Sequence, residues 1–152
     1  MGKLHRERFR RFDPTRVPSP CFVVDEAALE HNLRLLERVQ RGSGARILLA
    51  LKAFSMHALA PLISRHLCGV CASGLYEARL GRETFGGEVH TFSAAYRERD
   101  LPEVLALSDY VIFNSFGQWK RFRPLLREAE IRRPGLRFGL RINPEHTDCL
   151  LY

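Results

Sequence analysis

The chain has 152 residues, of which 45% are hydrophobic and 27% charged, and its formal net charge is +7. That length and balance predict one soluble globular domain with its own core. No run approaches the roughly 20 apolar residues of a membrane span, and no signal-peptide stretch follows the charged N-terminus, so we expect a cytoplasmic protein without a membrane partner.

The N-terminal part begins with a basic tail over residues 1–17, which we expect to be flexible. Three prolines then mark an extended lead-in, because proline and the residue before it both resist helix: Pro14, Pro18 and Pro20. Residues 21–24 predict a short lead strand. Asp25 is the expected N-cap of a helix over residues 26–41, which Gly42 closes and whose apolar face carries Leu29, Leu33 and Leu36.

Five further apolar runs predict strands, and each of the first four is followed by a helix-like segment. The runs begin near Ile47, Gly69, Val89, Tyr110 and Arg137. Such alternation predicts an α/β fold with a parallel sheet covered by helices. Periodicity leaves a closed barrel and an open doubly wound sheet both open, and the absence of GxGxxG and GxxxxGK[ST] favours the barrel.

The length predicts an incomplete barrel. An eight-stranded (β/α) barrel needs about 250 residues. Residues 18–152 therefore supply the N-terminal part of a (β/α)8 TIM-like barrel, the lead strand plus about five barrel strands. We expect the chain to be a fragment of a longer protein.

The positive charge raises nucleic-acid binding as a rival function. Elsewhere in the chain arginine and glutamate recur at i,i+4 spacing, which is typical of a solvated helix face, as in Glu30/Arg34 and Glu37/Arg41. The sequence has no zinc finger, RNP-like aromatic pattern or recognition-helix signature. We expect no nucleic-acid partner, and a non-catalytic basic binding fragment stays as an alternative.

Cys68 and Cys71 form a CxxC pair, which raises a zinc half-site. No second CxxC or HxxxH completes four ligands. We interpret the cysteines as reduced thiols near the apolar segment around Val70 and expect no metal.

Residues 47–55 read ILLALKAFS, in which an apolar run ends at Lys52. Functional side chains of parallel α/β folds gather at the carboxyl ends of strands. An ammonium buried there is costly unless it is paired, reaches water or loses its proton. In the last case the amine becomes a nucleophile that condenses with a carbonyl group. Position alone leaves a lysine that snorkels to water and a carbonyl-binding lysine equally open.

The run LLALKAFS resembles the lysine motif of the fold-type III pyridoxal-phosphate enzymes, which include alanine racemase and ornithine decarboxylase. Among them, the chain resembles the carboxynorspermidine (carboxyspermidine) decarboxylase family over residues 18–146. Six blocks carry the resemblance in the family's order: SPCFVVDEAALEHNLRLLERVQ, ALKAFS, ASGLYEARLG, EVHTFSAAY, VIFNSFGQWKRF and GLRINPE. Ala94 stands where family members usually have proline, and the pattern fades after Glu145.

This resemblance implies a barrel that binds pyridoxal 5′-phosphate (PLP), with Lys52 as the catalytic lysine that bonds to the cofactor. It implies a cofactor-site role for Arg141, with a barrel-layer arginine paired internally as the alternative. Ser73 either contacts the cofactor or caps the next helix. His57 and His90 are acid–base candidates, for which a surface or helix-start position is the simpler interpretation.

The implied reaction is decarboxylation of carboxynorspermidine or carboxyspermidine to norspermidine or spermidine, in a homodimer. In such relatives the lead strand belongs with a C-terminal β-domain, and the glycine-rich phosphate loop also lies downstream. We therefore expect this chain to lack both and to be inactive, or nearly so, alone. Another fold-type III amino-acid decarboxylase or a racemase using the same lysine stays as an alternative.

Overall fold

The architecture is a parallel sheet of five strands with a helical segment between each pair. The computed structural model describes residue 10 and residues 12–146. The strands are β1 (Leu48–Ala50), β2 (Gly69–Ala72), β3 (Glu88–Ser93), β4 (Tyr110–Phe113) and β5 (Arg137–Leu140). These bounds confirm the five predicted strand positions to within one residue.

The order of the strands distinguishes a barrel from a doubly wound sheet. A doubly wound sheet reverses its strand order at a switch point, whereas the strands of a barrel follow one another around it. Here the order is β1-β2-β3-β4-β5, and all four pairings are parallel. The sheet is therefore an arc of a (β/α) barrel, as predicted.

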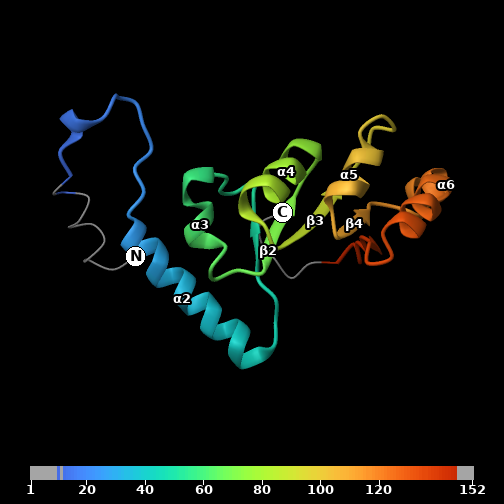
Figure 1. Cartoon of the computed structure of the whole chain (residues 1–152), viewed down its shortest axis with the longest axis horizontal. Helices are drawn as coiled ribbons and strands as arrows, with labels where there is room; N and C mark the ends of the chain where they lie inside the picture. The colour runs from blue at the N-terminus through green and yellow to red at the C-terminus, as the bar shows by residue number, and fades with distance from the viewer. Residues whose placement is uncertain (1–9, 11, 147–152) are drawn as a thin grey trace.

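The helical segments are η1 (Pro14–Arg16), α2 (Glu26–Ser43), η2 (His57–Leu59), α3 (Ala60–Ile63), α4 (Leu75–Leu80), η3 (Gly81–Phe85), α5 (Leu101–Leu107) and α6 (Phe116–Arg132). Figure 1 shows α3 to α6 following one another along the sheet. None of the helices in the described part of the chain is long and apolar enough to cross a membrane.

The helices cover one face of the sheet, which we call the outer face. Four strand residues on this face are completely buried: Val89, Thr91, Val111 and Phe113. The residues that alternate with them on β3 and β4 are only half-buried. Val111 and Phe113 share an apolar cluster with residues of α5 and α6, among them Val104 and Phe122. We call the opposite, less buried face of the sheet the inner face.

Helix α2 begins as the sequence predicts. The Asp25 side chain accepts a hydrogen bond from the Ala28 N–H at 3.0 Å, which caps the helix. The helix ends two residues later than predicted, because Gly44 rather than Gly42 adopts the left-handed conformation, with a φ of 72°. The predicted i,i+4 ion pairs Glu30/Arg34 and Glu37/Arg41 are both present.

The predicted lead strand is wrong. Residues 21–24 form no strand, and the Phe22 side chain is 96% exposed. A strand needs a neighbouring edge to satisfy its backbone N–H and C=O groups. Residues 21–24 pair with neither β1 nor β5, the two strands at the ends of the sheet. Most of the predicted basic tail lies outside the described residues.

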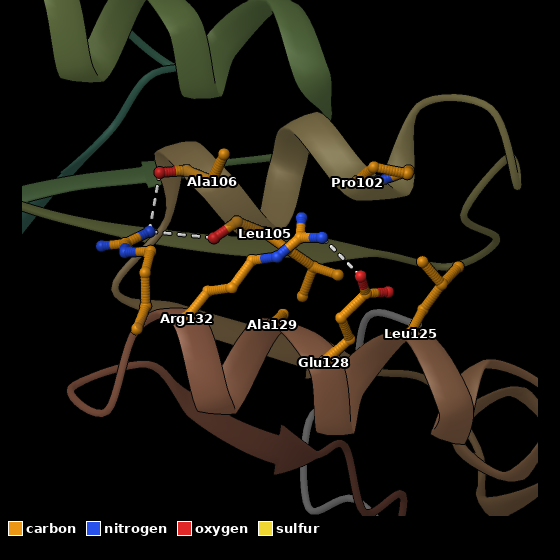
Figure 2. Close-up of a pocket in the computed structure, with 8 residues that line it drawn as sticks. Pro102, Leu105, Ala106, Leu125, Glu128, Ala129 and Arg132 are labelled. Carbon is orange, nitrogen blue, oxygen red and sulfur yellow. Dashed lines mark hydrogen bonds and ion pairs between the residues drawn. The ribbon is translucent and has the colours of Figure 1, made fainter.

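A small cleft lies in the helical layer, between α5 and α6 (Figure 2). It encloses about 110 Å³ and is lined mainly by apolar side chains, including Leu105, Leu125 and Ala129, with Glu128 and Arg132 at its edge. These residues belong to the helices of the outer layer, so the cleft does not lie on the inner face of the sheet.

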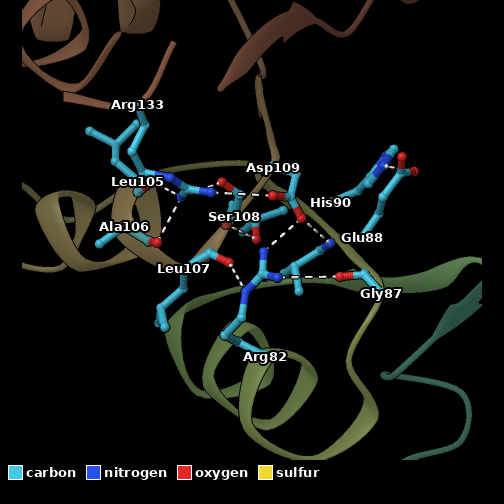
Figure 3. Close-up of polar contacts among 12 residues, drawn as sticks. Arg82, Gly87, Glu88, His90, Leu105, Ala106, Leu107, Ser108, Asp109 and Arg133 are labelled. Atoms are coloured by element: carbon cyan, nitrogen blue, oxygen red, sulfur yellow. Dashed lines mark hydrogen bonds and ion pairs between the residues drawn. The ribbon is translucent and has the colours of Figure 1, made fainter. Parts of the chain in front are cut away.

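A polar cluster joins the amino ends of β3 and β4 around Asp109 (Figure 3). The Asp109 carboxylate accepts hydrogen bonds from the Val89 N–H at 2.9 Å, from Arg82 Nη2 at 2.6 Å and from Arg133 Nη2 at 3.2 Å. Burial alone would raise the pKa of Asp109, but these hydrogen bonds and the charges of the two arginines outweigh it and lower that pKa.

The two arginines of this cluster also bind backbone carbonyls. Arg82 donates to the carbonyls of Leu107 and Gly87 at 2.9 and 3.3 Å. Arg133 donates through Nη1 to three carbonyls at the end of α5, those of Leu105, Ala106 and Ser108. Each guanidinium therefore satisfies carbonyls that a helix end or a loop leaves unpaired. We call Asp109, Arg82 and Arg133 the amino-edge cluster.

Candidate functional site

The predicted site residues follow the carboxyl ends of three strands. Lys52 lies two residues beyond β1, Ser73 directly follows β2, and Arg141 directly follows β5. The carboxyl ends of parallel strands lie at the same edge of a sheet, so the fold brings these residues to one edge. We call it the carboxyl edge.

The pairing register places Ser73 and Arg141 on the inner face. One row across the inner face consists of Ala50, Cys71, His90, Tyr110 and Arg137. Successive side chains of a strand point to opposite faces, so residues at even spacing from this row share its side. By this alternation Ser73 and Arg141 lie on the inner side of the carboxyl edge, and the charge of Lys52 acts on Cys71 of the inner row.

Lys52 is exposed in a turn immediately after β1. The turn is closed by hydrogen bonds from the Ala53 and Phe54 N–H groups to the Ala50 carbonyl, at 3.0 and 3.2 Å. Burial raises the pKa of the Cys71 thiol, and the charge of Lys52 partly opposes that rise. The Lys52 amine therefore lies within electrostatic reach of Cys71 on the inner face.

The sequence suggested a buried lysine, and the structure places an exposed one. Among the described residues Lys52 forms no ion pair. Of the three ways to accommodate the ammonium, the structure favours exposure to solvent. The amine remains accessible to a ligand at the carboxyl edge.

Ser73 lies beside this lysine, and its hydroxyl is exposed. Helix α4 starts at Leu75, with Gly74 at its N-cap position, and no side chain caps it. The Ser73 backbone N–H instead donates to the Glu77 carboxylate at 2.7 Å. Capping by the Ser73 side chain is therefore wrong, and its hydroxyl is open at the edge where a cofactor would bind.

Arg141 is exposed at the end of β5. Its guanidinium donates to the Asn114 side-chain oxygen at 3.3 Å and lies 5.8 Å from the centre of the Phe92 ring. No carboxylate pairs with it among the residues that the structure describes. Its partners are therefore internal but uncharged, and the cofactor-site role of Arg141 stays a prediction beside the alternative of a barrel-layer arginine paired internally.

The two histidine candidates differ in position. His57 starts η2 and is exposed, as the simpler interpretation expected. His90 is half-buried within β3, so a surface or helix-start position is wrong for it. Its ring contacts Glu88 at 3.1 Å and stacks on Tyr110 with ring centroids 4.1 Å apart. Sequence reasoning missed the stacking of His90 on Tyr110, because these two residues lie on strands that are separated along the chain.

The carboxyl edge suits a carbonyl-bearing ligand that also carries oxyanions. Lys52 offers an amine, Ser73 a hydroxyl and Arg141 a cation whose neighbours are uncharged. PLP presents an aldehyde, a phosphate and a phenolic oxygen, so these residues fit it. No group of His, Cys, Asp and Glu within residues 10 and 12–146 is arranged to hold a metal ion.

Comparisons with known proteins identify the family. No protein-family model matches the chain. It is 43% identical over 131 residues to carboxyaminopropylagmatine decarboxylase from Synechocystis, and 40% identical over 106 residues to carboxynorspermidine/carboxyspermidine decarboxylase from Herminiimonas arsenicoxydans. The alignments cover 86% and 70% of this chain. The chain is a homologue of these decarboxylases. It spans about a third of the length of either relative, 33% and 29%.

Solved structures agree with this assignment. Carboxynorspermidine decarboxylase from Campylobacter jejuni, solved in complex with norspermidine, superposes on 74% of this chain with a TM-score of 0.71 and 34% identity, over 30% of its own length. D-threonine aldolase from Filomicrobium marinum superposes with a TM-score of 0.67 at 18% identity, covering 88% of this chain and 37% of its own, and it supports the fold alone. The resemblance to the decarboxylase family and the partial barrel are confirmed.

Proposed function

We propose that this chain forms part of a PLP-dependent decarboxylase that converts carboxynorspermidine or carboxyspermidine to norspermidine or spermidine. The homology to decarboxylases of this class supports the reaction. The observation that carries the proposal is the accessible Lys52 amine at the carboxyl edge, where Ser73 and Arg141 also lie. We propose the activity for a protein of the relatives' full length, as a cytoplasmic homodimer.

Each of the three residues has a defined part in this proposal. Bound PLP supplies an electron sink for the bond that breaks as carbon dioxide leaves. Lys52 holds the cofactor through its amine and later accepts or returns a proton at Nζ. Arg141 binds an oxyanion of the ligand, and the Ser73 hydroxyl donates a hydrogen bond to it.

A second substrate deserves a test because of one relative. The Synechocystis protein, at 43% identity, is named for carboxyaminopropylagmatine, in which a guanidinium group replaces a terminal amine. Both substrates carry an amino-acid group at one end, and they differ in the cationic group at the other end. A decarboxylation assay of the full-length protein with each compound separates the two candidates.

Reductive trapping tests the role of Lys52 in a protein of the relatives' full length, because the phosphate loop is expected downstream of this chain. Incubation with PLP followed by borohydride is expected to fix a pyridoxyl group on Lys52, detected by peptide mass spectrometry. Lys120 provides a matched control, because it is also an exposed lysine but lies on α6. The Lys52→Ala variant is expected to lose the adduct, and Lys120→Ala to keep it. Equal labelling of both lysines at low PLP concentration would contradict the proposal.

A further inference from the structure

A side-chain network joins the carboxyl ends of β3, β4 and β5. Gln118 donates through Nε2 to the Ala94 carbonyl, just beyond β3, at 3.2 Å. Its Oε1 accepts from the Asn114 N–H, just beyond β4, at 3.0 Å. The Asn114 side chain then accepts from Arg141, just beyond β5, at 3.3 Å. Three neighbouring strand ends are thus connected through two amide side chains.

The start of α6 explains why Gln118 takes this position. Ser115 is the N-cap, and its hydroxyl accepts from the Gln118 N–H at 3.1 Å. Gln118 is the third helical residue, the position from which a glutamine side chain reaches back over the N-terminus of a helix. Here it reaches the N–H of Asn114, the residue before the cap. The Ser-x-x-Gln sequence therefore fixes the backbone that carries the Asn114 side chain.

Arg141 is held in a different way from the arginines of the amino-edge cluster. Arg82 and Arg133 both pair with the Asp109 carboxylate. Arg141 has a neutral amide and an aromatic ring as its neighbours, and among the described residues it has no carboxylate partner. A guanidinium held by uncharged groups keeps its full charge and several free N–H donors for an incoming oxyanion.

We propose that Asn114 and Gln118 are positioning residues that orient Arg141 to bind an oxyanion of the ligand. This inference rests on the proposed function, because it requires a ligand at the carboxyl edge. Four strand spacings of about 4.8 Å separate β1 from β5 along the sheet. The oxyanion belongs either to PLP or to the substrate carboxylate.

Trapping at Lys52 provides the measurement. The first arm compares the concentrations of PLP and of pyridoxal, which lacks the phosphate, that give half-maximal labelling. The second arm compares how strongly carboxynorspermidine and norspermidine, which lacks the carboxylate, compete with labelling. If Arg141 binds an oxyanion, the protein prefers the compound that carries this oxyanion over its partner compound in one of the two arms. A preference for PLP that falls on mutation identifies the phosphate, and a preference for carboxynorspermidine that falls on mutation identifies the carboxylate.

The variants test Arg141 and its supports separately. Arg141→Ala is expected to reduce the discrimination about tenfold, because it removes a charge-assisted contact. Asn114→Ala and Gln118→Ala are expected to reduce it about threefold by loosening Arg141. Asn114→Asp is expected to reduce it at least as much as Asn114→Ala, since the new carboxylate neutralises Arg141. Arg137→Ala, at the opposite end of β5, is the matched control and is expected to leave both ratios unchanged.

The outcomes separate this inference from the proposed function. If the wild-type chain labels Lys52 but the Asn114 and Gln118 variants keep both ratios, the positioning role is wrong and the proposed function stands. If an effect of Asn114→Ala comes with a lower midpoint of urea unfolding and equal losses for both members of each pair, the role of Asn114 is structural. If the wild-type protein of full length fails to label Lys52 selectively, the proposed function and this inference both fall.

Discussion

The two edges of the sheet use charged side chains in opposite ways. At the amino edge, Asp109 is bound by two arginines and a backbone N–H, and the arginines bind five carbonyls between them. At the carboxyl edge, the exposed Lys52 and Arg141 pair with no carboxylate among the described residues. Charges that are mutually satisfied stabilise a fold, whereas charges left open are available to a ligand. We therefore propose that the amino edge stabilises the fold and that the carboxyl edge binds the ligand.

The largest expected effect is at the amino edge. Asp109→Ala leaves two half-buried guanidiniums without their carboxylate and the Val89 N–H without its acceptor, so we expect a loss of about 2–3 kcal/mol in the free energy of unfolding. Urea denaturation followed by circular dichroism measures it. At the carboxyl edge, Arg141→Ala is expected to change that free energy by less than about 0.5 kcal/mol. Equal losses in the two variants would remove the distinction between the edges.

The pH dependence of stability provides a second test of the amino-edge cluster. The folded state lowers the pKa of Asp109 below its reference value of 3.8. A lowered pKa contributes stability above the unfolded pKa and loses it as pH falls toward the folded one. We expect the urea midpoint of the wild-type chain to fall between about pH 5 and 3, and that of Asp109→Asn to fall less steeply.

Glu103 is the control for this measurement. Its pKa is also lowered, by its hydrogen bond to Arg79, but the pair lies exposed on the helices. Exposed pairs contribute little to stability. Glu103→Gln is therefore expected to keep most of the wild-type slope. A slope that follows Glu103 rather than Asp109 would place the acid sensitivity in the helical layer.

A smaller effect is expected from Tyr96, a partly buried tyrosine in the loop after β3. Burial raises the pKa of Tyr96, and its hydroxyl lies 2.9 and 3.1 Å from the carbonyls of Thr91 and Ile112. Tyr96→Phe removes the donor while keeping the ring that packs edge-on against Phe113. We expect a loss of about 1 kcal/mol in the free energy of unfolding. A larger loss, near that of Asp109→Ala, would show that stability is spread across both halves of the sheet.

The elements were predictable because local pattern and tertiary structure agree. The apolar runs that predict β2 to β5 become strands at the predicted places, and the Asp25 cap fixes the start of α2. The same reasoning gave a wrong prediction for residues 21–24, because a strand depends on a partner as well as on its own composition. In the described part of the chain they pair with neither β1 nor β5, the two edge strands of the sheet.

The site was predictable only where it depends on one strand end. Position after an apolar run makes Lys52 a candidate, and the flanking blocks that resemble the decarboxylase family favour it. The contact between Arg141 and Asn114 joins residues 27 positions apart, and no local pattern encodes it. The environment of Lys52 was also misjudged: an apolar strand before it suggested burial, whereas the turn after Ala50 places it in solvent.

The last prediction concerns the electrostatic interaction between Lys52 and Cys71 of the inner face. Burial raises the pKa of the Cys71 thiol and the Lys52 charge lowers it, so removing that charge should raise the pKa further. A smaller thiolate fraction reacts more slowly, and we expect Lys52→Ala to slow iodoacetamide alkylation of Cys71 by about twofold. Cys68 is the internal control, since its thiol lies within hydrogen-bonding distance of Gln40, at 3.0 Å. The alkylation rate of Cys68 should stay constant in the same peptide map.

A Lys52 that carries a reduced PLP adduct provides a second control, because its amine keeps a positive charge. Faster alkylation of Cys71 in the Lys52→Ala variant than in the reduced adduct would show an effect of access to Cys71 rather than of charge. Slower alkylation would place the Lys52 charge on the inner face, where the proposed ligand must meet it.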